Sequence, residues 1–289
     1  MNRIKYLGLL ALLFLSVNEV LAGGGWPQAK GSGYIKLAEW WVISNQHYTD
    51  NGLIDPNVTT GLFNTTLYAE YGFTDRFTGI LYMPLFSRTY FNNTISSTTG
   101  EVIAPGEAIN SIGDADITLK YGLITNKKIV LSASLTLGIP LGESAGGSLG
   151  TLQTGDGEFN QMIQLDASTS WQWGSFNMYG SIYGAYNNRT NSFSDEIRFG
   201  AEVGVTFWEN RITAIARLYG ISSLKNGESI EPGNATSIFA NNTEFVSFSP
   251  ELNYNFNENF GVSASYGIAF SGKLIFANPS YSVGAYYKW

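Results

Sequence analysis

The sequence has no cysteine and a single histidine, and these absences remove several function classes. Without cysteine there are no disulfides, no thiolate metal sites and no thiol catalysis. His47 has no second histidine with which to share a metal ion, and no serine motif accompanies it as a Ser-His-Asp hydrolase would require. The sequence therefore predicts neither an enzyme nor a metal site.

Two motifs come close to known ligand sites and fail on a required feature. The run Gly267 to Leu274 approaches a phosphate-binding loop, but leucine stands where serine or threonine is needed, and no helix pattern follows. Asp114, Asp116 and Asp156 are possible calcium ligands, yet no twelve-residue calcium loop is present and a solvated loop is favoured. We expect no cofactor.

Charge and hydropathy narrow the choice further. The formal net charge of −7 argues against nucleic acid as a partner, because phosphate binding needs clustered Lys and Arg. No apolar run reaches the roughly 20 residues of a transmembrane helix. Residues 1–22 instead have the features of a secretory signal peptide: a basic start, an apolar run from Leu7 to Val17, and Val20-Leu21-Ala22 as the cleavage site. Residues 23–289 are expected to be exported as one domain.

What the chain has in abundance is alternation of apolar and polar residues with a period of two, which predicts β-strands. Twelve strands are expected, at about 33–44, 60–71, 77–86, 114–123, 129–139, 163–171, 176–187, 196–207, 212–219, 248–256, 260–270 and 281–289. Five tight turns, near residues 74, 126, 174, 209 and 258, alternate with six longer connections. An even strand number with connections sorted by length predicts an all-β transmembrane barrel with short periplasmic turns, long extracellular loops and both termini in the periplasm.

The final strand carries a resemblance. Its residues Ser282, Gly284, Tyr287 and Trp289 match the C-terminal assembly signal of bacterial outer-membrane β-barrels, which the chain therefore resembles. The resemblance implies a Gram-negative outer-membrane location, with membrane lipid and the barrel assembly machinery as partners. Aromatic residues also gather at strand ends on the apolar side, as an interfacial girdle would require. They are Trp41, Tyr71, Tyr121, Trp171, Phe207, Phe256, Phe270, Tyr287 and Trp289.

Some stretches depart from the regular pattern. Glu39 interrupts the apolar side of the first strand, which indicates either a bulge or an inward pairing of this side chain. Pro250 suggests a bulge in the tenth strand. The stretches 46–58 and 87–112 are expected to be loops. Residues 23–32 have no periodicity and are expected to form a short periplasmic lead, too short for a plug.

The polar face of a barrel turns inward, so its residues are the expected lumen lining. These are Glu70, Asp114, Asp116, Lys120, Asp166, Glu196, Arg198, Glu202, Arg217, Glu251, Tyr68, Tyr179, Tyr183 and Tyr219. The charges either pair with one another or line a polar conduit. A barrel of this size should leave a restricted lumen, which the tyrosines would narrow. The glycine-rich loop 142–157 either folds inward as a constriction or stays a mobile surface loop.

A second resemblance lies in the middle of the chain. The runs Ser111 to Ile124 (SIGDADITLKYGLI), Leu137 to Gly142 (LGIPLG) and Gln153 to Phe159 (QTGDGEF) are similar to the barrels of the phenol-degradation meta-pathway, which are akin to outer-membrane fatty-acid transporters. The resemblance spans about Ser111 to Tyr219 and implies passive uptake of a small apolar or aromatic solute. This chain lacks the transporters' N-terminal hatch. The alternative is a closed barrel whose loops bind a surface partner.

Overall fold

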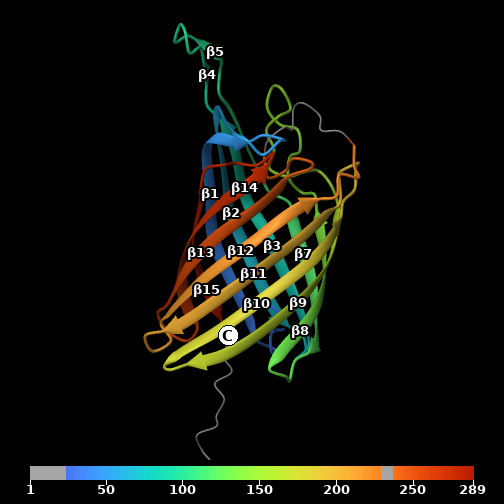
Figure 1. Ribbon diagram of the computed structural model, residues 1–289, viewed down its shortest axis with the longest axis vertical. Coiled ribbons are helices and arrows are strands. Elements are labelled where there is room, and N and C mark those ends of the chain that lie inside the picture. The colour runs from blue at the N-terminus through green and yellow to red at the C-terminus, as the bar shows by residue number, and fades with distance from the viewer. Residues whose placement is uncertain (1–23, 229–236) are drawn as a thin grey trace, which may run out of the picture.

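A computed structural model shows a closed antiparallel β-barrel (Figure 1). It describes residues 24–228 and 237–289, so the expected signal peptide, residues 1–22, lies outside the described chain. Within those two ranges no helix is long and apolar enough to cross a membrane. Twelve strands form the ring: β1 (Gly33–Tyr48), β2 (Ile54–Gly72), β3 (Phe77–Phe91), β7 (Ala115–Ile124), β8 (Ile129–Ile139), β9 (Asn160–Trp173), β10 (Phe176–Asn188), β11 (Glu196–Phe207), β12 (Ile212–Ser223), β13 (Glu244–Asn255), β14 (Phe260–Lys273) and β15 (Ser280–Lys288).

The ring closes where the first and last strands meet. β1 pairs with β15 in an unbroken register from Tyr34 opposite Lys288 to Val42 opposite Ser280. Tight connections lie at one end of the barrel, here called the turn end, and longer connections lie at the other, the loop end (Figure 1). The sequence prediction of a twelve-stranded antiparallel barrel is confirmed.

The stretch 87–112, expected to be a loop, is largely strand. It contains the end of β3 and three further strands, β4 (Thr94–Ile95), β5 (Val102–Ala104) and β6 (Glu107–Ser111). β6 pairs with the loop-end part of β3 and β7 with its turn-end part, so together they act as one interrupted wall strand. β4 and β5 form a separate hairpin that projects beyond the barrel (Figure 1). The loop expected at 46–58 is also mostly strand, because β1 and β2 continue pairing past Ser44.

The expected irregularities fall at other positions. Glu39 sits in continuous register between Thr65 and Val283, with neither a bulge nor an inward turn, and Thr65 Oγ1 donates a 2.6 Å hydrogen bond to Glu39 Oε2. Pro250 likewise lies in register opposite Ala216, and the irregularity of β13 is at Val246 and Ser247. A hydroxyl on the neighbouring strand thus satisfies the carboxylate that the sequence pattern could not place.

Burial is inverted relative to a water-soluble protein. The inward positions hold buried polar residues such as Glu70, Lys120 and Asp166, whereas large apolar residues such as Leu165 and Ile182 are exposed on the outside. Aromatic rings gather at the turn end in contacting pairs, including Phe77 with Tyr121 and stacked Tyr287 with Trp289. An apolar band with an aromatic edge is the surface that a lipid bilayer requires.

Candidate functional site

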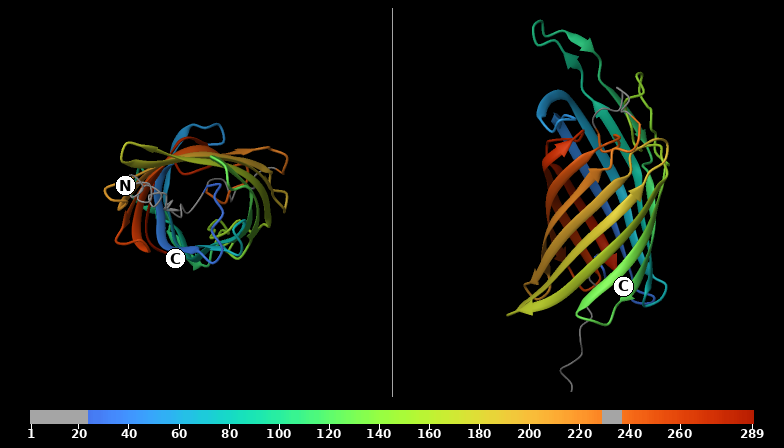
Figure 2. Two further views of the ribbon diagram at one scale, coloured as in Figure 1. Left: turned by 90° about the horizontal axis from the view of Figure 1, so that it is seen from below. Right: turned by 45° about the vertical axis from the view of Figure 1, so that its right-hand side comes forward.

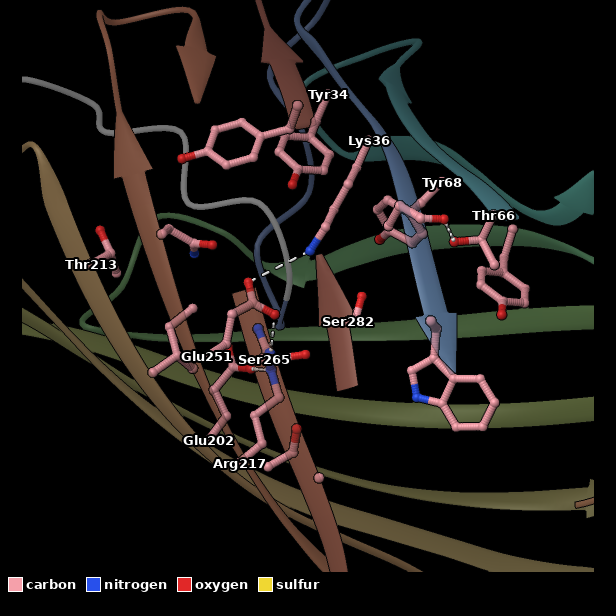
Figure 3. A pocket seen from close by; sticks show the side chains of 18 of the residues that line it. Tyr34, Lys36, Thr66, Tyr68, Glu202, Thr213, Arg217, Glu251, Ser265 and Ser282 are labelled. Atoms are coloured by element: carbon pink, nitrogen blue, oxygen red, sulfur yellow. Dashed lines mark hydrogen bonds and ion pairs between the residues drawn. The ribbon is translucent and has the colours of Figure 1, made fainter. Parts of the chain in front are cut away.

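The lumen contains a cavity of about 560 Å³, here called the first cavity, against β12–β15, β1 and β2 (Figure 3). Its walls come from inward positions of these strands, where the alternation of each strand brings every second side chain into the barrel. About half of the lining is aromatic or ionisable: Tyr34, Lys36, Trp40, Tyr68, Glu70, Tyr82, Tyr179, Glu202, Arg217, Tyr219, Glu251, Tyr286 and Lys288.

Four charged groups of this cavity form one chain of ion pairs, and Glu70 instead accepts hydrogen bonds from Gln28 and Tyr68. Lys36 Nζ lies 3.7 Å from Glu251 Oε1, and Glu251 Oε2 lies 2.8 Å from Arg217 Nη1. Arg217 also donates through Nε to Glu202 on the adjacent strand. Figure 3 shows these side chains converging from β1, β11, β12 and β13. Lys36 and Arg217 therefore each have a carboxylate partner, as groups withdrawn from bulk water require.

Tyrosines pack flat against glycines on the neighbouring strand. Tyr179 lies opposite Gly204, and Tyr183 lies opposite Gly200. A β-carbon at Gly204 would stand 2.0 Å from Tyr179 Cε1, and one at Gly200 would stand 2.3 Å from Tyr183 Cε1. The absent glycine side chain is thus what allows each ring to lie along the wall.

A second cavity, of about 420 Å³, lies against β3 and β7–β12. It shares Tyr68, Tyr82, Glu202, Arg217 and Tyr219 with the first cavity. Its other ionised groups are Asp116, Lys120 and Asp166. The Arg217–Glu202 pair and the tyrosines beside it therefore form the partition between the two halves of the lumen.

The segment 24–32 lies inside the barrel, which corrects the expectation of a periplasmic lead. In the end-on view of Figure 2 a blue stretch of chain lies within the ring. Gln28 Nε2 donates to Glu70 Oε2 at 2.6 Å, and Lys120 Nζ donates to the carbonyl of Gly24 at 2.6 Å. The ring of Trp26 meets that of Tyr179 edge-on at 6.1 Å. The segment is short, but hydrogen bonds to inward side chains hold it, so it narrows the lumen without needing a fold of its own.

A buried ion cluster joins the loops at the loop end. Arg189, between β10 and β11, lies 2.7 Å from Glu196 and 3.2 Å from Asp156, and it also contacts Glu158. Arg198 completes the cluster at 2.7 Å from Glu196. Burial raises the pKa of Glu158 to about 7, supported by the nearby charge of Asp156 and opposed by Arg189.

The glycine-rich loop 142–157 is anchored by its two ends. The Asp114 carboxylate, at the break between β6 and β7, accepts hydrogen bonds from the backbone N–H of Gly142 at 2.9 Å and of Asp156 at 2.8 Å. Gln153 and Thr154 are buried, and the Gln153 carbonyl accepts from Thr89 on the inner wall of β3. The tip around Leu149 is exposed. The buried stretch 152–155, and not the tip, is therefore the part of the loop that contacts the inner wall of the barrel.

An apolar cluster adjoins the first cavity. Val42 and Leu62 pack with Phe276, and Trp40 and Phe239 lie against them. Trp40 also lines the first cavity, so the cluster and the cavity are continuous. The cluster therefore adds apolar surface to one edge of the tyrosine-lined cavity.

The structure places the expected lumen residues in three groups. Glu70, Tyr68, Tyr179, Glu202, Arg217, Tyr219 and Glu251 line the first cavity. Asp116, Lys120, Asp166 and Tyr183 line the second. Asp114, Glu196 and Arg198 belong to the loop-end contacts.

Several residues that contribute to these sites were not predicted from the sequence. Tyr34, Lys36, Tyr82 and Tyr286 occupy inward strand positions that the alternation would have assigned. Arg189, Glu158, Gln28 and Trp26 lie outside the regular strands, where periodicity gives no signal.

Comparison with known proteins agrees on the fold. No family model matches the chain, and no relative among curated proteins does. An outer membrane channel from Pseudomonas putida F1 aligns with a TM-score of 0.58 and 15% identity, over 94% of this chain and 100% of that one. The chain has the fold of a bacterial outer-membrane β-barrel. Two weaker likenesses, each with a TM-score of 0.46, carry no further argument. They are the KdgM porin in complex with disordered oligogalacturonate (10% identity, 89% and 99% coverage) and the β domain of the Bordetella autotransporter BrkA (13%, 91% and 100%).

Proposed function

We propose that this outer-membrane barrel is a narrow passive channel for a small uncharged solute with aromatic or apolar character. The observation that carries the proposal is the first cavity, where Lys36, Glu251, Arg217 and Glu202 pair with one another and tyrosine rings form much of the wall. An ion entering it would have to compete with the Glu251–Arg217 pair, whereas a neutral ring can stack on the tyrosines. The resemblance to the phenol meta-pathway barrels supports a phenolic solute.

The test compares two solutes that differ in charge and little else. Phenyl glucoside is neutral, and phenyl glucuronide carries a carboxylate. In swelling assays with proteoliposomes we expect the glucoside to enter several times faster. Trp40→Ala should change glucoside entry, because Trp40 joins the cavity to the apolar cluster beside it. Arg88→Gln is the matched control, because Arg88 is exposed and bonds Asn110 outside the lumen. Equal entry of the two solutes would refute the preference for neutral cargo.

We propose the orientation in which the turn end and both chain ends face the periplasm, with Ser282, Gly284, Tyr287 and Trp289 as the signal read by the barrel assembly machinery. Trp289 exchanges backbone hydrogen bonds with Gly33 at 3.1 Å in both directions, so the last residue also helps to close the ring. Trp289→Ser should lower the yield of folded barrel in cells. External protease should cut the β4–β5 hairpin in intact cells, and the opposite orientation would protect it.

The projecting hairpin favours a second candidate, a barrel that binds a partner at the cell surface. Ile95, Val102 and Ile103 are exposed on it, well away from the barrel wall. Replacing residues 94–104 with a short glycine linker should leave solute entry unchanged if the channel is the function. If surface binding is the function, that replacement should abolish binding of the partner to the cell surface. Liposomes that contain the wild-type barrel should then show no solute entry.

A further inference from the structure

Four serine side chains line one wall of the first cavity, and their hydroxyls have no hydrogen-bond partner among the described residues. They are Ser249 on β13, Ser265 on β14, and Ser280 and Ser282 on β15, here called the serine patch. Each is half-buried, and Figure 3 shows Ser265 and Ser282 beside Glu251. A hydroxyl both donates and accepts, so the patch offers neutral hydrogen-bonding groups that the described chain itself does not use.

Strand pairing brings these serines next to one another. Ser265 lies directly opposite Ser282, and Ser280 lies opposite Gly267. Side chains that oppose each other on antiparallel strands have β-carbons about 4.5–5.5 Å apart, so one small ring can reach both hydroxyls. A β-carbon at Gly267 would stand 2.8 Å from Ser280 Oγ and 3.8 Å from Ser249 Oγ. The absent side chain of Gly267 therefore leaves room between those two hydroxyls.

The serine patch adjoins an aromatic side chain. Trp40 lies opposite Ser282 in the pairing of β1 with β15, and both residues line the first cavity. Trp40 also packs against the apolar cluster of Val42, Leu62 and Phe276. One part of the cavity thus combines an apolar ring face with several neutral hydrogen-bonding groups, which is the combination that binds small molecules.

We infer that the serine patch and Trp40 form a subsite for a neutral glycoside with an aromatic substituent. The aromatic ring stacks on Trp40, and the sugar hydroxyls exchange hydrogen bonds with the serines. A simple phenol has a single hydroxyl and would leave most of the patch unused, whereas a sugar ring carries several. The inference rests on the proposed channel function, because a ligand reaches the patch only through the lumen, and it narrows the solute to a hydroxylated one.

The test is equilibrium binding to the barrel purified from outer membranes, measured by calorimetry with two probes. Phenyl glucoside carries the sugar hydroxyls, and 2-phenoxytetrahydropyran has the same two rings without them. In Ser265→Ala/Ser280→Ala the affinity for phenyl glucoside should fall about tenfold, because two hydrogen bonds between neutral groups are lost. The affinity for 2-phenoxytetrahydropyran should not change. Trp40→Ala should weaken both probes. Ser282 stays unchanged because it belongs to the proposed assembly signal.

Ser263→Ala is the matched control, because Ser263 is a buried serine of β14 that does not line the cavity. Heat-modifiable migration in gels verifies that each variant is folded. If the double variant does not fold, the single substitutions replace it, each with an expected loss of about threefold. The inference is overturned by any of these results: no binding of phenyl glucoside, no loss in the serine variants, an equal loss for both probes, a loss in Ser263→Ala, or unchanged affinity in Trp40→Ala.

The subsite and the channel can fail separately. If neutral solutes enter liposomes faster than charged ones but phenyl glucoside binds without help from the serines, the proposed function holds and the subsite does not. If the serines set the affinity for phenyl glucoside while neutral and charged solutes enter equally fast, the subsite holds and the preference for neutral cargo does not.

Discussion

Gly204→Ala offers a sharp test of how the lumen is packed. The new β-carbon would lie 2.0 Å from Tyr179 Cε1, whereas ordinary contact begins at 3.4 Å, so the ring must retreat by about 1.4 Å. Tyr179 is buried and its ring also contacts Trp26, so the ring has little room to move. Overpacking of this kind typically costs about 1–3 kcal/mol, and we expect about 2 kcal/mol here, with segment 24–32 displaced as well.

The assay is reversible urea unfolding of the barrel in lipid vesicles, followed by tryptophan fluorescence. Gly184→Ala on β10 is the control, because no atom lies within 4 Å of its added β-carbon. Its free energy of unfolding should change by less than about 0.5 kcal/mol. In a Tyr179→Ala background the cost of Gly204→Ala should vanish, because the clashing ring is gone. Equal effects at Gly204 and Gly184, or a cost that persists without Tyr179, would refute the packing argument.

Three further predictions concern charges. Arg217→Gln removes the cation shared by Glu202 and Glu251, so the cation-to-anion permeability ratio should rise several-fold. An unchanged reversal potential in a KCl gradient would show that the guanidinium does not lie on the path of the ions. Burial raises the pKa of Glu158 from 4.5 to about 7, so its protonated form stabilises the loop-end cluster below pH 4.5, and that contribution is lost as the pH rises through 7. Proteolysis of loop 140–159 should therefore speed up from pH 5 to pH 8 in wild type but not in Glu158→Gln, and matching pH profiles would contradict this. Glu39→Leu removes an outward carboxylate and should raise the free energy of unfolding in bilayers by about 1 kcal/mol; a loss would mean that the bond from Thr65 outweighs the cost of the charge.

The barrel was predictable because the alternation of apolar and polar residues that produces it repeats along the sequence. Strand β7 illustrates this: Ile117, Leu119 and Tyr121 face outward while Asp116 and Lys120 face inward, and a bilayer around a wet lumen makes that alternation obligatory. The strand ends at the loop side were less predictable. Residues 54–58 belong to the stretch expected to be a polar, turn-rich loop, yet they continue β2 because the neighbouring β1 offers its backbone for pairing. Pairing satisfies the backbone whatever the side chains are.

The site was predictable only where it lies on strands. Glu202, Arg217 and Glu251 were expected to be inward, and cross-strand register then brings Glu202 opposite Arg217. That Lys36 joins them across the β1–β15 seam depends on barrel closure and side-chain reach, which a linear pattern does not contain. Segment 24–32 shows the same limit. Its glycines and Trp26 have no period, and their place becomes evident only once Ser168, Lys120 and Tyr179 form a surface to receive them.

The β4–β5 hairpin is hydrogen-bonded as a sheet of its own, apart from the ring. The length and sequence of this hairpin can therefore change without shifting the register of any wall strand, so variation here destabilises the barrel least. Foreign peptides inserted between Ile95 and Val102 should be displayed on the cell without loss of folding. The same insertion at the break between β6 and β7 would disturb Asp114 and the loop that it anchors.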